Sequence, residues 1–236
     1  MRKIISLLVF FSSIVFANEY YAKLNPLNTY TIKSAVSGKV VFVNDNIESK
    51  KALDSKIVKI DAKIDLEDLK QSKIKLKNLK EILKIEQGTL KSFKRVSSKS
   101  RFDKDNQKVK ILNISSTISD LETKIATLKD TISKKTLIES SNYIYNIAVE
   151  VGDYVTPGVE LYSSMDLSAG KLEIFIPIDK ADTIQEKTIY LDGKETDLKI
   201  SKLYKIADST HISSYKCEII IPSPARFSNL VKIEFK

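Results

Sequence analysis

The side chains that most often carry out catalysis or bind transition metals are scarce in this chain. Histidine occurs once, at His211, cysteine once, at Cys217, and methionine only at Met1 and Met165. A transition-metal site needs several such ligands that converge on one ion, and a single cysteine cannot form an internal disulfide. Cys217 begins an apolar run that ends at Ile221, so we expect a buried thiol. The composition therefore predicts no metal site and no internal disulfide.

Clustered carboxylates, which could act as a general acid and base, occur at Asp65, Glu67 and Asp68. They stand where a helix is expected to begin, and acidic side chains at that position stabilise the helix dipole. The sequence contains neither a glycine-rich phosphate loop nor the Gly-x-Ser-x-Gly turn of hydrolases. We therefore predict that the protein is not an enzyme.

The first seventeen residues have the pattern of an export signal. Arg2 and Lys3 form a basic start, an apolar stretch runs from residue 4 to residue 16, and Ala17 places a small residue at the expected cleavage point. The stretch is short for a membrane span, and its retention as an anchor is the alternative. We predict an exported chain whose remaining part is soluble and extracytoplasmic.

The formal net charge is +9, from 39 Lys and Arg against 30 Asp and Glu. Basic chains often bind nucleic acid or anionic lipid. An exported protein does not meet nucleic acid, and the lysines are spread along expected helical faces. We therefore interpret the charge as a solvated surface, with at most weak attraction to an anionic membrane, and predict no nucleic-acid partner.

Residues 62–138 have helical character, because they are rich in Lys, Leu, Ile and Glu and contain no proline. Apolar residues recur there at heptad spacing, first as leucines and later as a repeat of three and four. Such a narrow seam is typical of a coiled coil. The seam residues are Leu69, Leu76, Leu79, Leu83, Leu90 and Phe93, then Ile111, Ile114, Ile118, Leu121, Ile125, Leu128 and Ile132.

A polar, serine-rich break between Arg95 and Asp105 separates the two seams. Ser100 or Asp103 is suited to cap the second helix. Two seams of similar length joined by a short polar turn predict an antiparallel hairpin. The alternative is a parallel dimer with an interrupted seam. The flanking strand-rich segments disfavour it, because they indicate that the chain returns to the place it left.

The strand-rich segments on either side of the helical block repeat at an offset of 104 residues. Apolar positions are kept, while glycines occur mainly in the second copy. Asn can stand in for Gly at a repeat position, because it tolerates a positive φ better than other non-glycine residues do. The aligned pairs are Gly38 with Asn142, Val40 with Ile144, Val43 with Ile147, Glu48 with Gly152, Lys51 with Val155, Asp54 with Gly158, and Ile57 with Leu161.

Residues 35–41 (AVSGKVV) resemble the first half of a lipoyl-type β-sandwich, and residues 151–161 (VGDYVTPGVEL) resemble the second half. Carriers of biotin or lipoate present a modified lysine between the halves, but here the helical block stands at that point. Lys59 is therefore interpreted as a strand lysine, and no cofactor is expected. A lipoyl-like sandwich split by a helical hairpin resembles the HlyD-type membrane fusion proteins, which are periplasmic adaptors of tripartite efflux pumps and type I secretion systems.

This resemblance implies an α+β chain with six parts. They are an export signal (1–17), an N-terminal extension (18–29), the first half of a lipoyl-like β-sandwich (30–61), a long antiparallel coiled-coil hairpin (62–138, tip near 95–103), the second sandwich half (139–168) and a small β-barrel domain (169–236). The turns of the sandwich fall at Gly38, Gly152, Pro157 and Gly158. Glu48 and Asp54 depart from the glycines usual in the family.

The resemblance also implies a function in the periplasm, in association with the inner membrane. The protein would link an inner-membrane transporter of the RND or ABC type to a TolC-type outer-membrane channel, as a ring commonly of six copies. The residues of the channel-docking tip would be Arg95, Val96, Ser97, Ser98, Ser100 and Asp103. Among them, Arg95, Val96, Ser100 and Asp103 (or Asp105 in its place) resemble a shortened form of the family's docking pattern. The alternative is a periplasmic coiled-coil scaffold that regulates a cell-wall enzyme. Such a scaffold would not need the split repeat.

Overall fold

A computed structural model describes residues 18–236, so the predicted export signal lies outside the described residues. The chain divides into two compact units. The hairpin unit is Tyr30–Ser164, and the terminal unit combines residues 18–29 with Met165–Lys236. Strands β2 (Asn25–Lys33) and β8 (Glu160–Pro177) are the segments in which the chain passes between the units.

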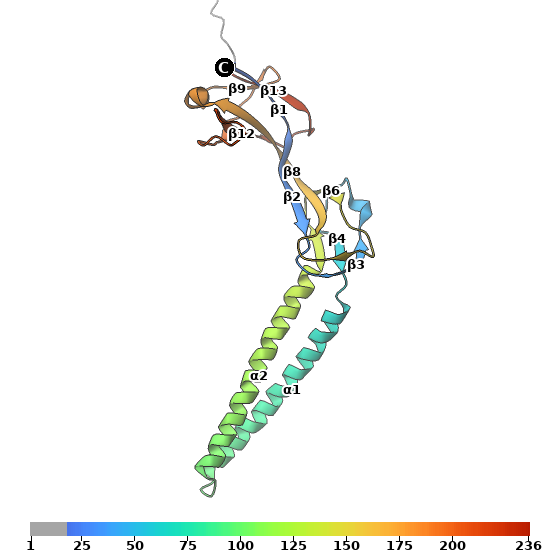
Figure 1. The fold of residues 1–236 in the computed structure, drawn as a ribbon, viewed down its shortest axis with the longest axis vertical. Coiled ribbons are helices and arrows are strands. Elements are labelled where there is room, and N and C mark those ends of the chain that lie inside the picture. The colour runs from blue at the N-terminus through green and yellow to red at the C-terminus, as the bar shows by residue number, and fades with distance from the viewer. Residues whose placement is uncertain (1–17) are drawn as a thin grey trace, which may run out of the picture. The chain divides into compact units, whose positions relative to one another are not determined.

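The hairpin unit carries two long helices on a small β body (Figure 1). In the body, a four-stranded sheet has the order β5-β4-β3-β7, and β6 pairs with β8. The elements are β3 (Gly38–Val43), the 3-10 turn η1 (Asp45–Ile47), β4 (Ser55–Ile60), α1 (Lys63–Arg95), α2 (Arg101–Lys134), β5 (Thr136–Glu139), β6 (Tyr143–Ile147) and β7 (Tyr154–Val155).

The terminal unit is built mainly from antiparallel strands. One sheet has the order β1-β13-β9-β10. In the other, β11 pairs with β12, and β12 pairs with the second part of β8. The elements are β1 (Asn18–Lys23), η2 (Ile178–Lys180), α3 (Ala181–Ile184), β9 (Ile189–Leu191), β10 (Lys194–Glu195), β11 (Ile200–Leu203), β12 (Ser214–Pro222) and β13 (Leu230–Phe235). Strands and helices in both units confirm the α+β class.

Each unit has its own apolar core. In the hairpin unit the core gathers around Val40, Ile57, Ile144 and Leu161, and in the terminal unit around residues such as Phe235. Burial of these side chains is the main favourable contribution to folding of each unit. No helix among residues 18–236 is long and apolar enough to cross a bilayer.

The repeat predicted from the sequence is present in the backbone of the hairpin unit. The Asn44 amide donates to the Ile57 carbonyl at 2.9 Å, and the Ala148 amide donates to the Leu161 carbonyl at 2.9 Å. Both donors and both acceptors are separated by the predicted offset, and both acceptor side chains lie in the core. The two halves of the β body therefore use equivalent residues for equivalent contacts.

Inside the repeat, one stretch of the first half is shifted by a residue. Ala52 occupies the buried place that Val155 has in the second half, while Lys51 is exposed and bridges Tyr143. The alignment of Lys51 with Val155 is therefore wrong by one position. The first half contains the short helix η1 just before this stretch, and such a turn accommodates an additional residue.

The second helix ends earlier than its composition suggests. We expected helix to continue to about Ile138, but α2 ends at Lys134 and residues 136–139 form β5. Strand β5 pairs with β4, with Thr136 opposite Lys59 and Ile138 opposite Lys56. β-Branched residues such as Thr and Ile fit a pleated strand well, so pairing with an existing strand overrides the helical pattern here.

The terminal unit also contains two short local elements. A short helical link follows Pro177, formed by η2 and α3. Asp192 and Gly193 form the tight turn between β9 and β10, with φ values of 49° and 80°. Two successive positive φ angles are typical of the hairpin turns that favour Asp-Gly. Residues 18–23, for which no strand was expected, form β1, which pairs with β13.

Candidate docking surface on the helical hairpin

The tip of the hairpin is the short loop of residues 96–100, between the end of α1 at Arg95 and the start of α2 at Arg101. Ser100 caps α2: its Oγ accepts a hydrogen bond from the Asp103 amide at 3.0 Å, and Asp103 Oδ2 accepts one from the Ser100 amide at 3.2 Å. This reciprocal capping box fixes the first turn of α2. It also shows that Ser100 and Asp103 share the capping role that we expected of one or the other.

The remaining predicted tip residues face solvent. Arg95, Val96, Ser97 and Ser98 are all exposed, and the Lys99 ammonium lies 4.7 Å from the centre of the Phe93 ring. The capping box engages the side chains of Ser100 and Asp103 with each other, which leaves the residues on the α1 side of the loop available to a partner. The tip therefore presents a cation, two hydroxyls and one apolar side chain.

The seam predicted from the sequence lies between the helices. Its members are buried or partly buried, and Ile118, Leu121 and Ile125 are the most enclosed, at 7–8% exposed. Ion pairs flank the seam on both sides, with Lys80 to Glu122 at 2.6 Å and Lys124 to Asp68 at 2.8 Å. A pair of long helices joined in this way is a stiff spacer. At 1.5 Å per residue, the 33 residues of α1 extend about 50 Å.

Two buried polar residues belong to the seam, Ser72 of α1 and Gln107 of α2. Gln107 is buried, and its Nε2 donates to the Glu86 carbonyl oxygen at 3.0 Å and to Glu86 Oε2 at 2.7 Å. Lys110 Nζ lies 2.5 Å from the other Glu86 carboxylate oxygen. Hydrogen bonds from Lys110 and Gln107 lower the pKa of Glu86. Extending the 3–4 spacing back by four residues from Ile111 would have placed Gln107 in the seam.

At the base of the hairpin, Lys135 follows α2 directly and is largely buried. Its Nζ lies 2.5 Å from Asp65 Oδ2 and 2.7 Å from the Asp61 carbonyl oxygen. The acid at position 65, expected only to stabilise the helix dipole, therefore also receives a specific cation. No local sequence pattern could have shown this pair, because its members are 70 residues apart.

The predicted sandwich turns lie in the hairpin unit and take the conformations expected of glycine. Gly152 and Gly158 have φ of 113° and 94°, and Pro157 precedes the second. At Gly38, a Cβ atom would lie 2.6 Å from Ile60 Cγ2, so the close approach requires glycine. Asp54, the repeat partner of Gly158, also has a positive φ, of 46°. Asp tolerates this region better than most residues.

Outside the hairpin, the residues that first suggested chemistry are structural. The His211 ring stacks on Phe175 with 3.4 Å between ring centres, and its Nδ1 lies 3.1 Å from Asp208. Cys217 is buried in the terminal core, and burial raises the pKa of its thiol to about 12. Lys59 lies in β4 between Phe42 and Thr136. Among residues 18–236, no three His, Cys, Asp or Glu side chains converge as metal ligands would.

Comparison with known proteins relates the chain to others through its fold. No protein-family model matches the sequence. No curated protein matches it either. MacA from Actinobacillus actinomycetemcomitans superposes with a TM-score of 0.72 at 15% identity, over 93% of this chain and 78% of that one. The membrane fusion protein Spr0693 from Streptococcus pneumoniae R6 gives 0.71 at 8% identity, over 93% and 98%.

A third structure, ZneB from Cupriavidus metallidurans, gives a TM-score of 0.56 at 13% identity, over 93% of this chain and 70% of that one. Likeness at such identities establishes the fold. The chain has the fold of membrane fusion proteins, which confirms the resemblance expected from its split repeat and helical block.

Proposed function

We propose that this protein is a non-catalytic periplasmic adaptor. It links an inner-membrane transporter, of the RND or ABC type, to a TolC-type outer-membrane channel for efflux or secretion. The observation that carries the proposal is the hairpin: two long helices tied at their base, packed along a seam, and ending in a small exposed polar tip. Similarity of the fold to a membrane fusion protein supports the same conclusion.

In this proposal the parts of the chain have separate tasks. Residues 1–17 export the chain, the β body of the hairpin unit is a lipoyl-like sandwich, and the terminal unit is the β-barrel that faces the transporter. Copies assemble side by side into a ring of six, so that their coiled-coil hairpins stand together. This arrangement keeps the tips of all copies at the same level, where they meet the channel.

The tip is suited to reversible docking. Arg95, Ser97 and Ser98 offer hydrogen-bond donors at an exposed end, and Val96 adds a small apolar contact. Contacts of this kind at a solvated rim give orientation and fast association rather than a permanent joint. If the open form of the channel offers better partners to these groups, docking shifts the channel towards that form.

Photo-crosslinking in the native host tests the proposal. A photoreactive residue is placed at Ser98, and a control is placed at Thr127, which is exposed on α2. We expect the Ser98 variant to capture an outer-membrane channel and the Thr127 variant not to capture it. Capture of a soluble cell-wall enzyme from Ser98 would contradict the proposal and favour the scaffold function.

A further inference from the structure

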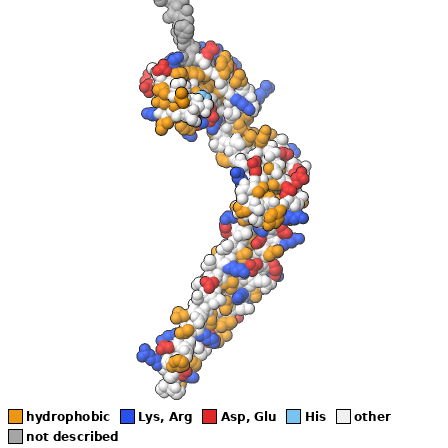
Figure 2. Space-filling view, viewed as in Figure 1, with side chains coloured by type: hydrophobic (Ala, Val, Ile, Leu, Met, Phe, Trp, Pro, Cys, Tyr) orange, Lys and Arg blue, Asp and Glu red, His pale blue; other side chains and the backbone are white. Residues whose placement is uncertain are grey.

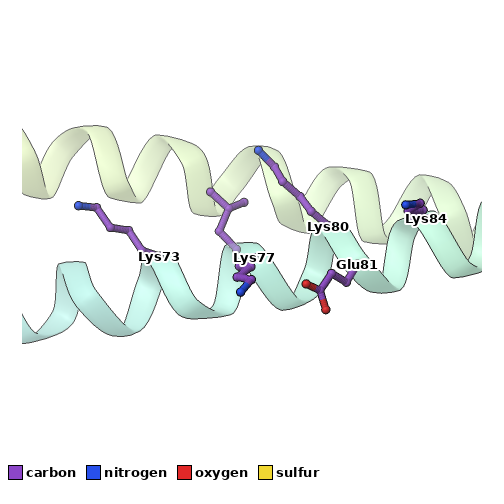
Figure 3. Close-up of a pocket in the computed structure, with 6 residues that line it drawn as sticks. Lys73, Lys77, Lys80, Glu81 and Lys84 are labelled. Atoms are coloured by element: carbon purple, nitrogen blue, oxygen red, sulfur yellow. The ribbon is translucent and has the colours of Figure 1, made fainter.

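One side of α1 carries a row of lysines beside an open groove. Lys73, Lys77, Lys80 and Lys84 are spaced by four, three and four residues, so they lie on one face of the helix. Together with Leu76 and Glu81 they line a groove of about 430 Å³ (Figure 3). The sequence suggested lysines spread over a solvated surface, whereas the structure gathers these four along a single line.

Most of the charge in this row is not neutralised by the chain itself. Lys80 pairs with Glu122 of α2 at 2.6 Å. The side chains of Lys73, Lys77 and Lys84 make no ion pair or hydrogen bond within residues 18–236. Many other charged side chains of the hairpin are paired, including Lys108, Lys110, Lys124 and Lys134. Three neighbouring cations are thus available to a partner.

The groove combines this charge with apolar surface. Leu76 and the lysines line it, and the aliphatic stems of the lysines contribute apolar surface, while the Lys80 ammonium pairs with Glu122. On the face of the hairpin seen in the space-filling view, hydrophobic, basic and acidic side chains are intermixed (Figure 2). An open groove that combines apolar lining with unpaired cations is complementary to an amphipathic helix that carries carboxylates. A phosphate polymer has no apolar side to fill it.

A second copy of this chain is a poor occupant. Among the carboxylates of α1 and α2, only Glu81 and Asp120 lack a hydrogen bond or ion pair within the described chain, and Glu81 already belongs to the groove. A like hairpin would have to break its own ion pairs to supply anions. The charge therefore favours a different protein.

We infer that the lysine row on α1 is a binding site for a carboxylate-bearing helix of a partner protein. This inference rests on the proposed function, in which the hairpin meets another helical protein, and it adds a lateral contact to the contact at the tip. The partner helix places an apolar side chain over Leu76 and carboxylates against Lys73, Lys77 and Lys84. The contact weakens with added salt, because exposed ion pairs are screened.

A binding measurement with the purified protein tests the chemistry. The probe is an alanine-based helical peptide with leucine at the centre of one side and glutamate on either side of it, and the same peptide with glutamine serves as its control. In the variant K73Q/K77Q/K84Q we expect binding of the glutamate peptide to weaken by about 3- to 100-fold. The matched variant K63Q/K75Q/K94Q neutralises three other lysines of α1. It should change the affinity for the glutamate peptide by less than about twofold.

Two results of this measurement would overturn the inference. One is equal weakening by both triple variants, which would mean that only the net charge matters. The other is binding of inorganic polyphosphate that is as tight as that of the peptide and equally sensitive to the groove variant. Helix content by circular dichroism, equal in all variants, confirms that they fold.

Crosslinking in cells separates this site from the tip. A photoreactive residue at Lys77 should capture a partner through a segment rich in Asp and Glu. Capture of a second copy of this chain, or of nothing while Ser98 captures a channel, would remove the lateral site and leave the adaptor function intact. If Ser98 captures no channel while Lys77 captures an acidic helix, the adaptor function is removed and the lateral site remains.

Discussion

Lys135 and Asp65 join the two ends of the helical hairpin: the ammonium of Lys135 lies 2.5 Å from Asp65 Oδ2, across 70 residues of sequence. Asp65 is in the first turn of α1, and Lys135 is the residue that follows α2. The pair is partly enclosed, with side chains 10% and 23% exposed. The place where the chain leaves the β body is thereby tied to the place where it returns.

Loss of this tie should destabilise the hairpin unit. Lys135→Ala leaves Asp65 without its cation in a partly buried place, and we expect the free energy of unfolding to fall by about 1–3 kcal/mol. Lys134→Ala is the matched control, because Lys134 pairs with Asp130 in solvent, and it should cost less than about 0.5 kcal/mol. Urea unfolding measures both. Equal losses of unfolding free energy in the two variants would show that the Lys135–Asp65 pair contributes no more than an exposed ion pair.

Two glycines should respond to alanine with opposite signs. At Gly38 the added Cβ would lie 2.6 Å from Ile60 Cγ2, so Gly38→Ala should cost about 1–3 kcal/mol. At Gly88, inside α1, nothing lies within 4 Å of the added atom, so Gly88→Ala should stabilise by about 0.5–1 kcal/mol. Thermal unfolding distinguishes the signs directly. A stabilising effect at Gly38 would contradict the close approach.

The seam should be sensitive to truncation, and the outer face should not. Leu121 is 8% exposed and Leu112 is 66% exposed, although both are leucines of α2. Leu121→Ala should cost about 2–4 kcal/mol, because it leaves a cavity between the helices. Leu112→Ala should change stability by less than about 0.5 kcal/mol in the isolated protein. A large effect at Leu112 would mean that this face is covered in solution.

Glu86 should make stability depend on pH in the acid range. Its contacts with Lys110 and Gln107 lower its pKa from 4.5, so the folded state holds its charged form more strongly than the unfolded state does. The stability it contributes is full above pH 4.5 and is lost as the pH falls through the folded pKa. Wild type should exceed Glu86→Gln in stability at pH 7, and the two should converge on acidification. A constant difference down to low pH would contradict the charge-based contribution.

Some features of this protein were determined by its sequence alone. The heptad seam, the absence of proline over the helical block and the serine-rich break specify two helices and a capped turn. These signals are local, since the helical period and the cap each depend on residues within a few positions of one another. The split repeat also specified the equivalent core positions, such as Val40 and Ile144.

Other features were decided only by the tertiary structure. Residues 136–139 form a strand because they pair with β4. Ala52 is buried in place of Lys51 because the preceding turn contains one more residue than its counterpart in the second half. Two further features depend on which side of α1 faces α2. One is the Lys135–Asp65 pair, and the other is the lack of carboxylate partners at Lys73, Lys77 and Lys84. Such relationships join residues far apart in the chain, and no local pattern encodes them, because the packing of whole elements against one another sets which residues become partners.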